Sequence, residues 1–145
     1  MSRYFETYRS HVINAQVDLI GHMNIQFYHT AISQSMQGVF HHLGYTPEII
    51  KSGRGFAAVD QHCQYRSELL PGDLVHMISG IKDFTPKSIT VHHQLFNSAT
   101  KKLSFDCIMT ALHFDMNSRK VINFDQETLE RLASLKIKDG EVTHA

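Results

Sequence analysis

Asp18, Gly21, His22 and Asn24 lie within one short stretch of the sequence, directly before a long segment with helical periodicity. Carboxylate and imidazole groups take part in nucleophilic attack and proton transfer, and glycine permits a tight turn. The first turn of a helix carries unpartnered backbone N–H groups and a partial positive charge, so it stabilises anions. This combination is suited to acyl transfer, because a carbonyl oxygen becomes negative when a nucleophile attacks the carbon.

The backbone N–H groups of Ile25 and Gln26 are the oxyanion donors that this arrangement predicts, since they begin the predicted helix. Asp18 precedes them on a loop, so its carboxylate can stand on the other side of the carbonyl. There it would act as a nucleophile or as a general base, and the sequence leaves both roles open. His22 and Asn24 can orient this carboxylate or hold a water molecule.

An ordinary structural interpretation accounts for the same residues. Asn24 stands at the N-cap position, where its side chain can accept a hydrogen bond from a free backbone N–H group. An aspartate before a helix compensates the helix dipole, and a histidine in the first turn is a common loop residue. Spacing alone therefore leaves a cap and a catalytic site as open alternatives for Asp18.

Apolar residues recur every three or four positions between residues 25 and 43, which predicts a helix with a wide apolar face. Gly44 provides a stop signal after His41 and His42, and Pro47 follows shortly afterwards. At roughly 1.5 Å per residue, this helix is about 28 Å long. The periodic positions are Ile25, Tyr28, Ile32, Met36, Val39 and Leu43.

Five segments predict strands, at residues 4–13, 56–69, 74–84, 88–96 and 103–114, because they alternate with a period of two or are rich in aromatic and β-branched residues. Short turns join the last four, so we expect antiparallel neighbours. Asp125 is placed to cap a final short helix. In the segment 56–69 the residues expected on the apolar face are Ala57, Val59, Cys63, Tyr65 and Leu69.

This order of elements predicts an α+β fold in a single domain over residues 1–145, with a polar tail from about residue 138. One long helix cannot cover both faces of a five-stranded sheet, so we expect a curved antiparallel sheet wrapped around that helix. The other face and the edge strands then meet solvent or a second copy of the chain. The expected assembly is a homodimer, and two dimers can stack into a homotetramer.

The charges of the chain balance, with 14 lysines and arginines against 14 aspartates and glutamates. A nucleic-acid-binding or polybasic membrane-surface protein needs a basic excess, so neither nucleic acid nor a membrane is an expected partner. No apolar run reaches the roughly 20 residues of a spanning helix, and the N-terminus lacks the apolar core of a signal peptide. We therefore expect a cytoplasmic protein in which Cys63 and Cys107 are buried, reduced thiols.

Three motifs carry a resemblance to a known family. The pattern Asp-x-x-Gly-His-Met-Asn-x-x-x-Tyr over residues 18–28 resembles the motif of hotdog-fold acyl-CoA thioesterases of the 4-hydroxybenzoyl-CoA thioesterase type, and Asp18 matches their catalytic aspartate. The pattern His-x-x-Tyr-x-x-Glu-x-x-x-Gly-Asp over residues 62–73 resembles the second strand and turn of that family. His-Phe-Asp at 113–115, with Asn-Phe at 123–124, is similar to the betainyl-CoA thioesterase group, which is linked to carnitine breakdown.

The resemblance implies the hotdog fold, a dimer or tetramer, and hydrolysis of an acyl-CoA without a metal or other cofactor. It implies a catalytic Asp18 and an active site between subunits, where the second subunit supplies part of the pocket wall. Gln61 and His62, on alternate faces of the second strand, are the candidates for that wall. Gly21 and Tyr28 belong to the matching motif and are further substrate-binding candidates.

CoA carries phosphates, so we expect a local basic patch in spite of the zero net charge. Arg66 and Glu68, in contrast, are expected on a solvated sheet face, as part of a cross-strand pair. Four basic residues in predicted turns are the candidates for the phosphate contacts: Arg54, Lys87, Lys101 and Lys102.

Two other functions fit the same fold, namely a non-catalytic module that binds acyl-CoA and a hydratase or dehydratase that acts on enoyl-CoA. The 11 histidines show no helical zinc-binding spacing. His62 beside Cys63 is no catalytic dyad, because neighbours on a strand face opposite ways. The acyl group stays open among betainyl, short-chain, aromatic and long-chain esters.

Overall fold

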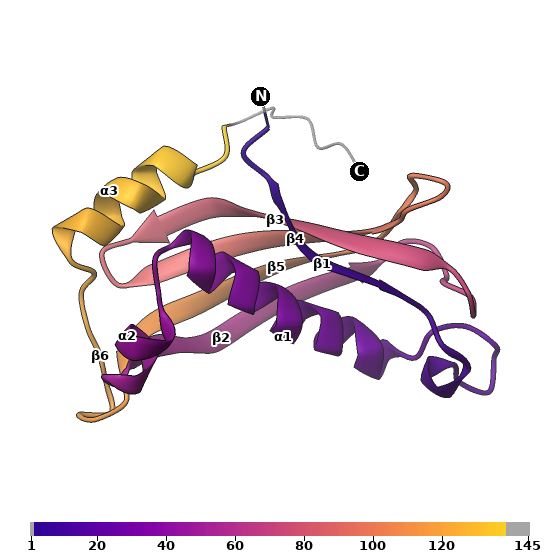
Figure 1. The fold of residues 1–145 in the computed structure, drawn as a ribbon, viewed down its shortest axis with the longest axis horizontal. Coiled ribbons are helices and arrows are strands. Elements are labelled where there is room, and N and C mark those ends of the chain that lie inside the picture. Colours follow the sequence, from indigo (N-terminus) through magenta and orange to yellow (C-terminus); the bar gives the residue numbers. More distant parts are fainter. Residues whose placement is uncertain (1, 139–145) are drawn as a thin grey trace.

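The computed structural model describes residues 2–138 and shows one long helix, α1 (Ile25–His42), lying across an antiparallel sheet (Figure 1). The order of the strands is β1-β3-β4-β5-β2, and the short β6 pairs with β5. The other helices are α2 (Pro47–Lys51) and α3 (Gln126–Leu135), and a 3-10 turn, η1 (Asn14–Gln16), follows β1. The strands are β1 (Phe5–His11), β2 (Arg54–Tyr65), β3 (Leu74–Thr85), β4 (Ser88–Asn97), β5 (Leu103–Asp115) and β6 (Lys120–Val121).

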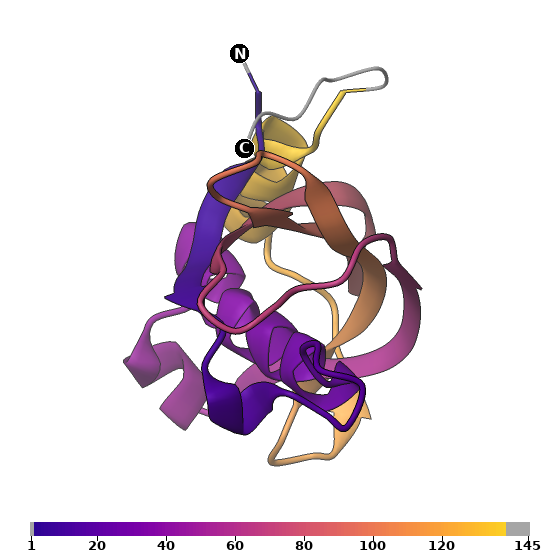
Figure 2. The ribbon, with the colours of Figure 1, turned by 90° about the vertical axis from the view of Figure 1, so that its right-hand side faces the viewer.

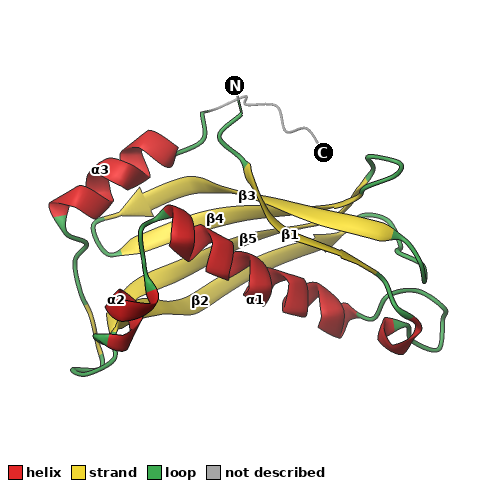
Figure 3. Cartoon of the chain, viewed as in Figure 1, coloured by secondary structure: helices red, strands yellow, loops and turns green. Residues whose placement is uncertain are grey.

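The sheet curves around α1, as the end-on view in Figure 2 shows. All strand pairs are antiparallel. Figure 3 separates the strands from the helices and shows α1 as the helix that runs along the sheet. The predicted arrangement of a curved sheet, one long helix and a short C-terminal helix is confirmed, and the predicted tail lies beyond residue 138, outside the described residues.

The boundaries of α1 follow from its caps and its periodicity. The Asn24 side chain accepts a hydrogen bond from the Gln26 N–H group at 3.0 Å, as expected for an N-cap. Gly44 takes a φ of +82° after the last turn, a conformation that only glycine adopts at low cost. The face of the helix turned to the sheet buries Tyr28, Ala31, Ile32, Ser35, Met36 and Val39.

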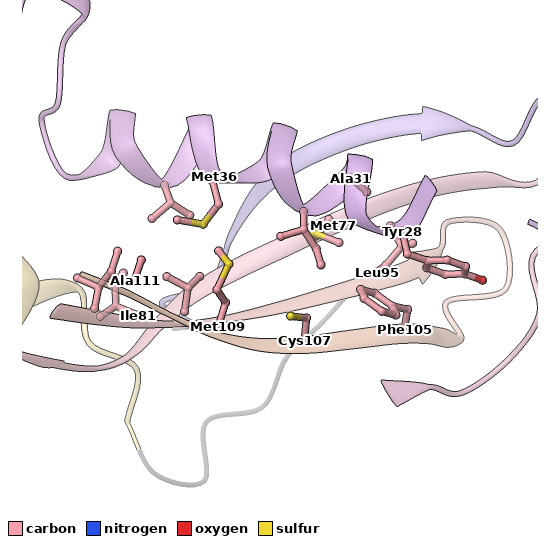
Figure 4. Packing of buried hydrophobic residues seen from close by; sticks show 14 of the residues in the cluster. Tyr28, Ala31, Met36, Met77, Ile81, Leu95, Phe105, Cys107, Met109 and Ala111 are labelled. Atoms are coloured by element: carbon pink, nitrogen blue, oxygen red, sulfur yellow. The ribbon is translucent and has the colours of Figure 1, made fainter. Parts of the chain in front are cut away.

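The core lies between α1 and the concave face of the sheet (Figure 4). Leu95, Ile81 and Phe105 are fully excluded from solvent there. Burial of each such side chain contributes on the order of 1.5–3 kcal/mol relative to exposure. Because this contact spans the whole length of α1, it fixes where the N-terminus of the helix lies relative to the strands.

A β-bulge in β2 changes which residues face the core. The register shifts between Ala58 and Asp60, and the extra residue, Val59, is 56% exposed. Beyond the bulge Gln61 pairs with the buried Met109. The odd-numbered residues from Gln61 to Tyr65 therefore face the core in this part of β2. The prediction that Ala57 and Val59 share the inward face of Tyr65 is therefore wrong, because one inserted residue reverses the alternation.

Two short elements were not predicted. Helix α2 has only five residues; it begins at Pro47 and is capped by Thr46, whose hydroxyl accepts from the Ile49 N–H group at 3.3 Å. Strand β6 has two residues and pairs with the end of β5. Both elements are too short to produce a periodic pattern.

Among the described helices, none is long and apolar enough to cross a membrane.

His93 on β4 is a fully buried polar residue. Its Nδ1 atom lies 2.7 Å from the hydroxyl of Ser79, which in turn lies 2.8 Å from that of Thr7. The Nε2 atom has no hydrogen-bond partner within the described chain. Burial, with a smaller effect of the neighbouring His92, lowers the pKa of His93 to about 3. The folded protein therefore holds His93 as the neutral imidazole.

We predict that His93 makes stability depend on pH. The unfolded chain binds a proton at His93 as the pH falls below about 6.5, whereas the folded chain does so only near pH 3, so acid favours unfolding. When the pH falls from 7 to 5, protonation of His93 in the unfolded chain should lower the free energy of unfolding by about 2 kcal/mol. Urea unfolding at both pH values should show a smaller loss for His93→Gln than for the parent. Equal losses in the two proteins would contradict this.

Candidate active site

A tight turn presents Asp18 beside the start of α1. Val17 and Met23 form an isolated bridge at its base. Within it the Asp18 N–H group donates to the His22 carbonyl at 3.0 Å, and the Gly21 N–H group donates to the Asp18 carbonyl at 3.1 Å. Gly21 has a φ of +95° and no neighbour within 4 Å of a hypothetical Cβ, so the turn needs glycine for its backbone conformation alone.

Two backbone hydrogen bonds fix the base of this turn to the rest of the protein. The Met23 N–H group donates to the carbonyl of the buried Leu69 at 2.8 Å, and the Asn24 N–H group donates to the Gln16 carbonyl at 2.8 Å. The tip of the turn, Leu19 and Ile20, is exposed. The position of Asp18 is thus set by anchored backbone on both sides.

The two carboxylate oxygens of Asp18 have different surroundings. Oδ1 accepts a hydrogen bond from the Ile20 N–H group at 2.9 Å, which orients the carboxylate. Oδ2 lies 3.9 Å from Nδ1 of His22, too far for a direct hydrogen bond but within ion-pair distance if His22 is protonated. The Asp18 side chain is 23% exposed, so it is held in place and still accessible.

The first amides of α1 are not equivalent. The Gln26 N–H group donates to the Asn24 side chain, and the Phe27 N–H group donates to the Asn24 carbonyl at 3.0 Å. The Ile25 N–H group has no acceptor among the described residues. Of the two predicted oxyanion donors, Ile25 is therefore available and Gln26 is already engaged by the cap.

A pocket of about 440 Å³ lies at this helix start. Its size is in the range of small-molecule sites. Five of the predicted site residues line it, whereas Gly21 and Gln26 do not. The lining residues are Asp18, His22, Met23, Asn24, Ile25, Tyr28, Tyr65, Arg66, Ser67 and Glu68.

Another part of the pocket wall comes from the segment that follows β2. Arg66 and Glu68 are exposed, as predicted, but they lie beyond the end of β2 and not on the sheet face. β2 ends at Tyr65, and the N–H groups of Arg66 and Ser67 both donate to the Ser104 carbonyl, at 2.8 and 3.2 Å. The chain therefore leaves the alternation of the strand and borders the pocket. The sequence did contain a signal for this position, because Glu68 is the glutamate of the second motif, over residues 62–73.

Arg66 does form a cross-strand pair, although it borders the pocket. Its Nε atom lies 2.6 Å from Oδ1 of Asp106, and its guanidinium also donates to Gln64. Nε2 of His92 lies 3.2 Å from the other oxygen of Asp106. The positive charge of Arg66 is thus balanced by the carboxylate of Asp106 on the neighbouring strand, β5.

Tyr28 joins the core to the pocket. Burial, together with the nearby Tyr65, Asp18 and Glu68, raises the pKa of Tyr28 to about 12. The hydroxyl therefore stays protonated and can donate a hydrogen bond. The rings of Tyr28 and Tyr65 meet edge to face, with centroids 5.1 Å apart. Two carboxylates and two aromatic rings consequently share this pocket.

The other predicted substrate-binding residues lie away from this pocket. Gln61 faces the core, where its Nε2 atom lies 3.3 Å from the Met109 sulfur, and His62 faces the opposite side of the sheet. Arg54 begins β2, at the end of the strand far from Tyr65, and lies 3.8 Å from Asp125.

The predicted basic patch is divided between the two ends of the sheet. Lys87 lies in the β3–β4 turn, at the end of the sheet remote from the pocket. Lys101 and Lys102 lie in the β4–β5 turn, directly before the segment around Ser104 that pairs with the pocket wall.

Within the described residues, no group of three His, Cys, Asp or Glu side chains is placed to hold a metal ion.

The fold is shared with solved structures of other proteins. A protein from Staphylococcus aureus, solved in complex with CoA, superposes with a TM-score of 0.82 at 18% identity, over 93% of this chain and 85% of that one. A Pseudomonas putida protein named as a putative thioesterase superposes with a TM-score of 0.77 at 21% identity, over 98% and 97% of the two chains. The hotdog fold is thereby confirmed.

The sequence profile of the thioesterase-like superfamily matches residues 12–132. The chain belongs to this family. It is also similar to the betainyl-CoA thioesterase of Pseudomonas aeruginosa, with 23% identity over 136 residues, which cover 93% of this chain and 86% of that protein.

Proposed function

We propose that the protein hydrolyses an acyl-CoA thioester at the start of α1, with Asp18 as the reacting carboxylate. The observation that carries this proposal is that Asp18 lines the same pocket as Ile25, whose N–H group has no acceptor among residues 2–138. In the proposed complex the Ile25 N–H group donates to the thioester carbonyl oxygen and stabilises the negative charge that develops there.

Two routes from this complex use the same groups. In one, Oδ2 of Asp18 attacks the thioester carbon, CoA leaves as the thiolate, and water hydrolyses the acyl-aspartyl anhydride. In the other, Asp18 takes a proton from water, the water oxygen attacks the carbon, and the C–S bond then breaks to release the CoA thiolate. Asp18 Oδ2 suits both, because Oδ1 is already held by the Ile20 N–H group. His22 and Tyr28 would position the water or the leaving group.

We predict that Asp18→Asn lowers kcat for acyl-CoA hydrolysis by about a hundredfold or more, because an amide neither attacks nor accepts the proton. The measurement is release of free CoA thiol. Asp83→Asn, on β3, is the matched control and should retain the parent rate. The melting temperature of Asp18→Asn should remain close to that of the parent.

Two outcomes would contradict the proposal. Hydrolysis by Asp18→Asn at the parent rate would remove Asp18 from the reaction. A parent protein that binds acyl-CoA esters without releasing thiol would instead be a non-catalytic binding module, and one that adds water to an enoyl-CoA would be a hydratase.

The pocket favours a positively charged acyl group. Asp18 and Glu68 give it two carboxylates, Tyr28 and Tyr65 give it aromatic rings, and the charge of Arg66 is balanced by Asp106. Carboxylates and aromatic rings together attract quaternary ammonium groups. The Pseudomonas aeruginosa protein to which this chain is similar is named for betainyl-CoA, whose acyl group contains a quaternary ammonium. A Rhizobium protein named L-carnitine dehydrogenase/betainyl-CoA thioesterase is 21% identical over 121 residues, which cover 83% of this chain and 24% of that protein.

We predict that betainyl-CoA is hydrolysed with a higher kcat/KM than 3,3-dimethylbutyryl-CoA, a neutral ester of the same shape. Glu68→Gln should lower the ratio of these two values about tenfold, which corresponds to roughly 1.4 kcal/mol of lost charge interaction. Steady-state kinetics with both esters measure the ratio. A ratio that Glu68→Gln leaves unchanged would show that Glu68 does not select the charge.

We also propose that the chain forms a homodimer through β2, and that two such dimers can stack into a homotetramer. β2 pairs with β5 on one side only, and none of its residues is buried in the described chain. Antiparallel pairing of two copies would place the Tyr65 end of one strand beside Arg54 of the partner subunit. A second hollow of about 220 Å³, lined in part by Phe40, Phe56 and Met116, would then adjoin the pocket across the interface.

We predict that the parent protein has twice the 16.6 kDa mass of the chain in solution. Val59 lies near the middle of β2, so Val59→Lys would bring two like charges together near the two-fold axis and should shift the mass toward the monomer. Light scattering after size exclusion measures this. Val121→Lys on β6 is the matched control, and an equal effect of both variants would contradict pairing through β2.

A further inference from the structure

The two cysteines of the chain face each other across neighbouring strands. Cys63 on β2 and Cys107 on β5 are register partners on the side of the sheet that faces α1. The pair lies between the rows Gln61–Met109 and Tyr65–Phe105. Cys107 is fully buried, whereas Cys63 is partly exposed in the single chain. Backbone pairing of β2 with a second copy would leave the Cys63 side chain on the face of the sheet toward α1.

The hydrogen-bond pattern shows which kind of pair the cysteines form. The Arg66 N–H group donates to the Ser104 carbonyl at 2.8 Å, so residues 66 and 104 form a hydrogen-bonded pair at the end of this ladder. Antiparallel pairs alternate between hydrogen-bonded and non-hydrogen-bonded types. Counting back along the register makes 64 and 106 hydrogen-bonded, and Cys63 and Cys107 non-hydrogen-bonded.

This geometry is compatible with a disulfide. In a non-hydrogen-bonded pair the Cα atoms are about 4.5 Å apart and the side chains are closest to each other. Disulfides span Cα separations of about 4.4–6.8 Å. The two strands therefore need only a small adjustment for the sulfur atoms to bond.

The surroundings of the thiols divide their roles. Burial raises the pKa of the Cys107 thiol, and the hydrogen bond and charge of the adjacent Cys63 raise it further. Cys107 consequently stays protonated and is shielded from solutes. Cys63 is the thiol that a small oxidant reaches first, because reactivity follows exposure and thiolate formation.

We propose that Cys63 and Cys107 are an oxidisable dithiol that closes into an intrachain disulfide between β2 and β5 when the protein meets hydrogen peroxide. The Cys63 thiolate attacks one peroxide oxygen, the O–O bond breaks, and a sulfenic acid and hydroxide form. The Cys107 sulfur then attacks the Cys63 sulfur, the S–O bond breaks, and water leaves with the Cys107 proton. Two electrons pass from the thiols to the peroxide, which is reduced to water.

The modification would lie next to the pocket wall. Tyr65 is two residues beyond Cys63 on the same face of β2, and its ring packs against Tyr28. A covalent tie between β2 and β5 at this row would fix the strand that carries Tyr65. The dithiol itself does not depend on the thioesterase reaction, so it can be tested without measuring hydrolysis.

The test is mass spectrometry of the folded full-length protein after exposure to hydrogen peroxide. The expected result is a loss of about 2 Da, which a thiol reductant reverses, with Cys63 and Cys107 joined in one peptide pair. The chain should keep its monomer position on a denaturing, non-reducing gel. An unchanged mass, a gain of oxygen without cross-linking, or a disulfide between two chains would overturn the proposal.

Single substitutions identify the order of the two steps. Cys107→Ser should leave Cys63 as a sulfenic acid that dimedone traps, while Cys63→Ser should remain unmodified under the same exposure. Both variants should retain the circular dichroism spectrum of the parent. Trapping of Cys107 in folded Cys63→Ser, or no trapping in folded Cys107→Ser, would contradict the assignment of Cys63 as the first thiol.

Discussion

The proposed site depends on one constraint, which is that the N-terminus of α1 must point an unpartnered amide into a pocket that Asp18 also borders. Packing of α1 against the concave sheet face sets the position of that terminus. The bond from the Met23 N–H group to the Leu69 carbonyl then fixes the turn that carries Asp18. Asn24 caps the helix but leaves the Ile25 amide unused. Hydrogen bonds that stabilise the helix start therefore also decide which amide is free to bind a ligand.

The second wall of the pocket shows how the end of a strand can shape a site. Beyond Tyr65 the chain stops alternating, and Arg66 and Glu68 both border the pocket. Asp106 balances the charge of Arg66, so the carboxylate of Glu68 keeps its influence on the pocket. In the proposed function this carboxylate forms a negative subsite for the acyl group.

The sequence predicted the elements better than the details of the site. The period of α1, its Asn24 cap and the Gly44 stop are local signals, and they located the helix correctly. The bulge at Val59 was not predictable, because one inserted residue leaves no mark on a pattern that is read as uninterrupted alternation. Gln26 illustrates a different failure. An N-cap side chain accepts from the second or third amide of the helix, so the predicted cap already competed with the oxyanion role given to Gln26.

The most direct test of the central claim is a crystal structure of Asp18→Asn with the unhydrolysed acyl-CoA that the parent protein turns over. In this complex we predict that the thioester carbonyl oxygen lies about 2.7–3.1 Å from the Ile25 amide nitrogen, with the side chain at position 18 on the other side of the carbonyl carbon. An ester whose carbonyl lies away from the start of α1, or a helix start covered by protein when the ester is bound, would contradict it.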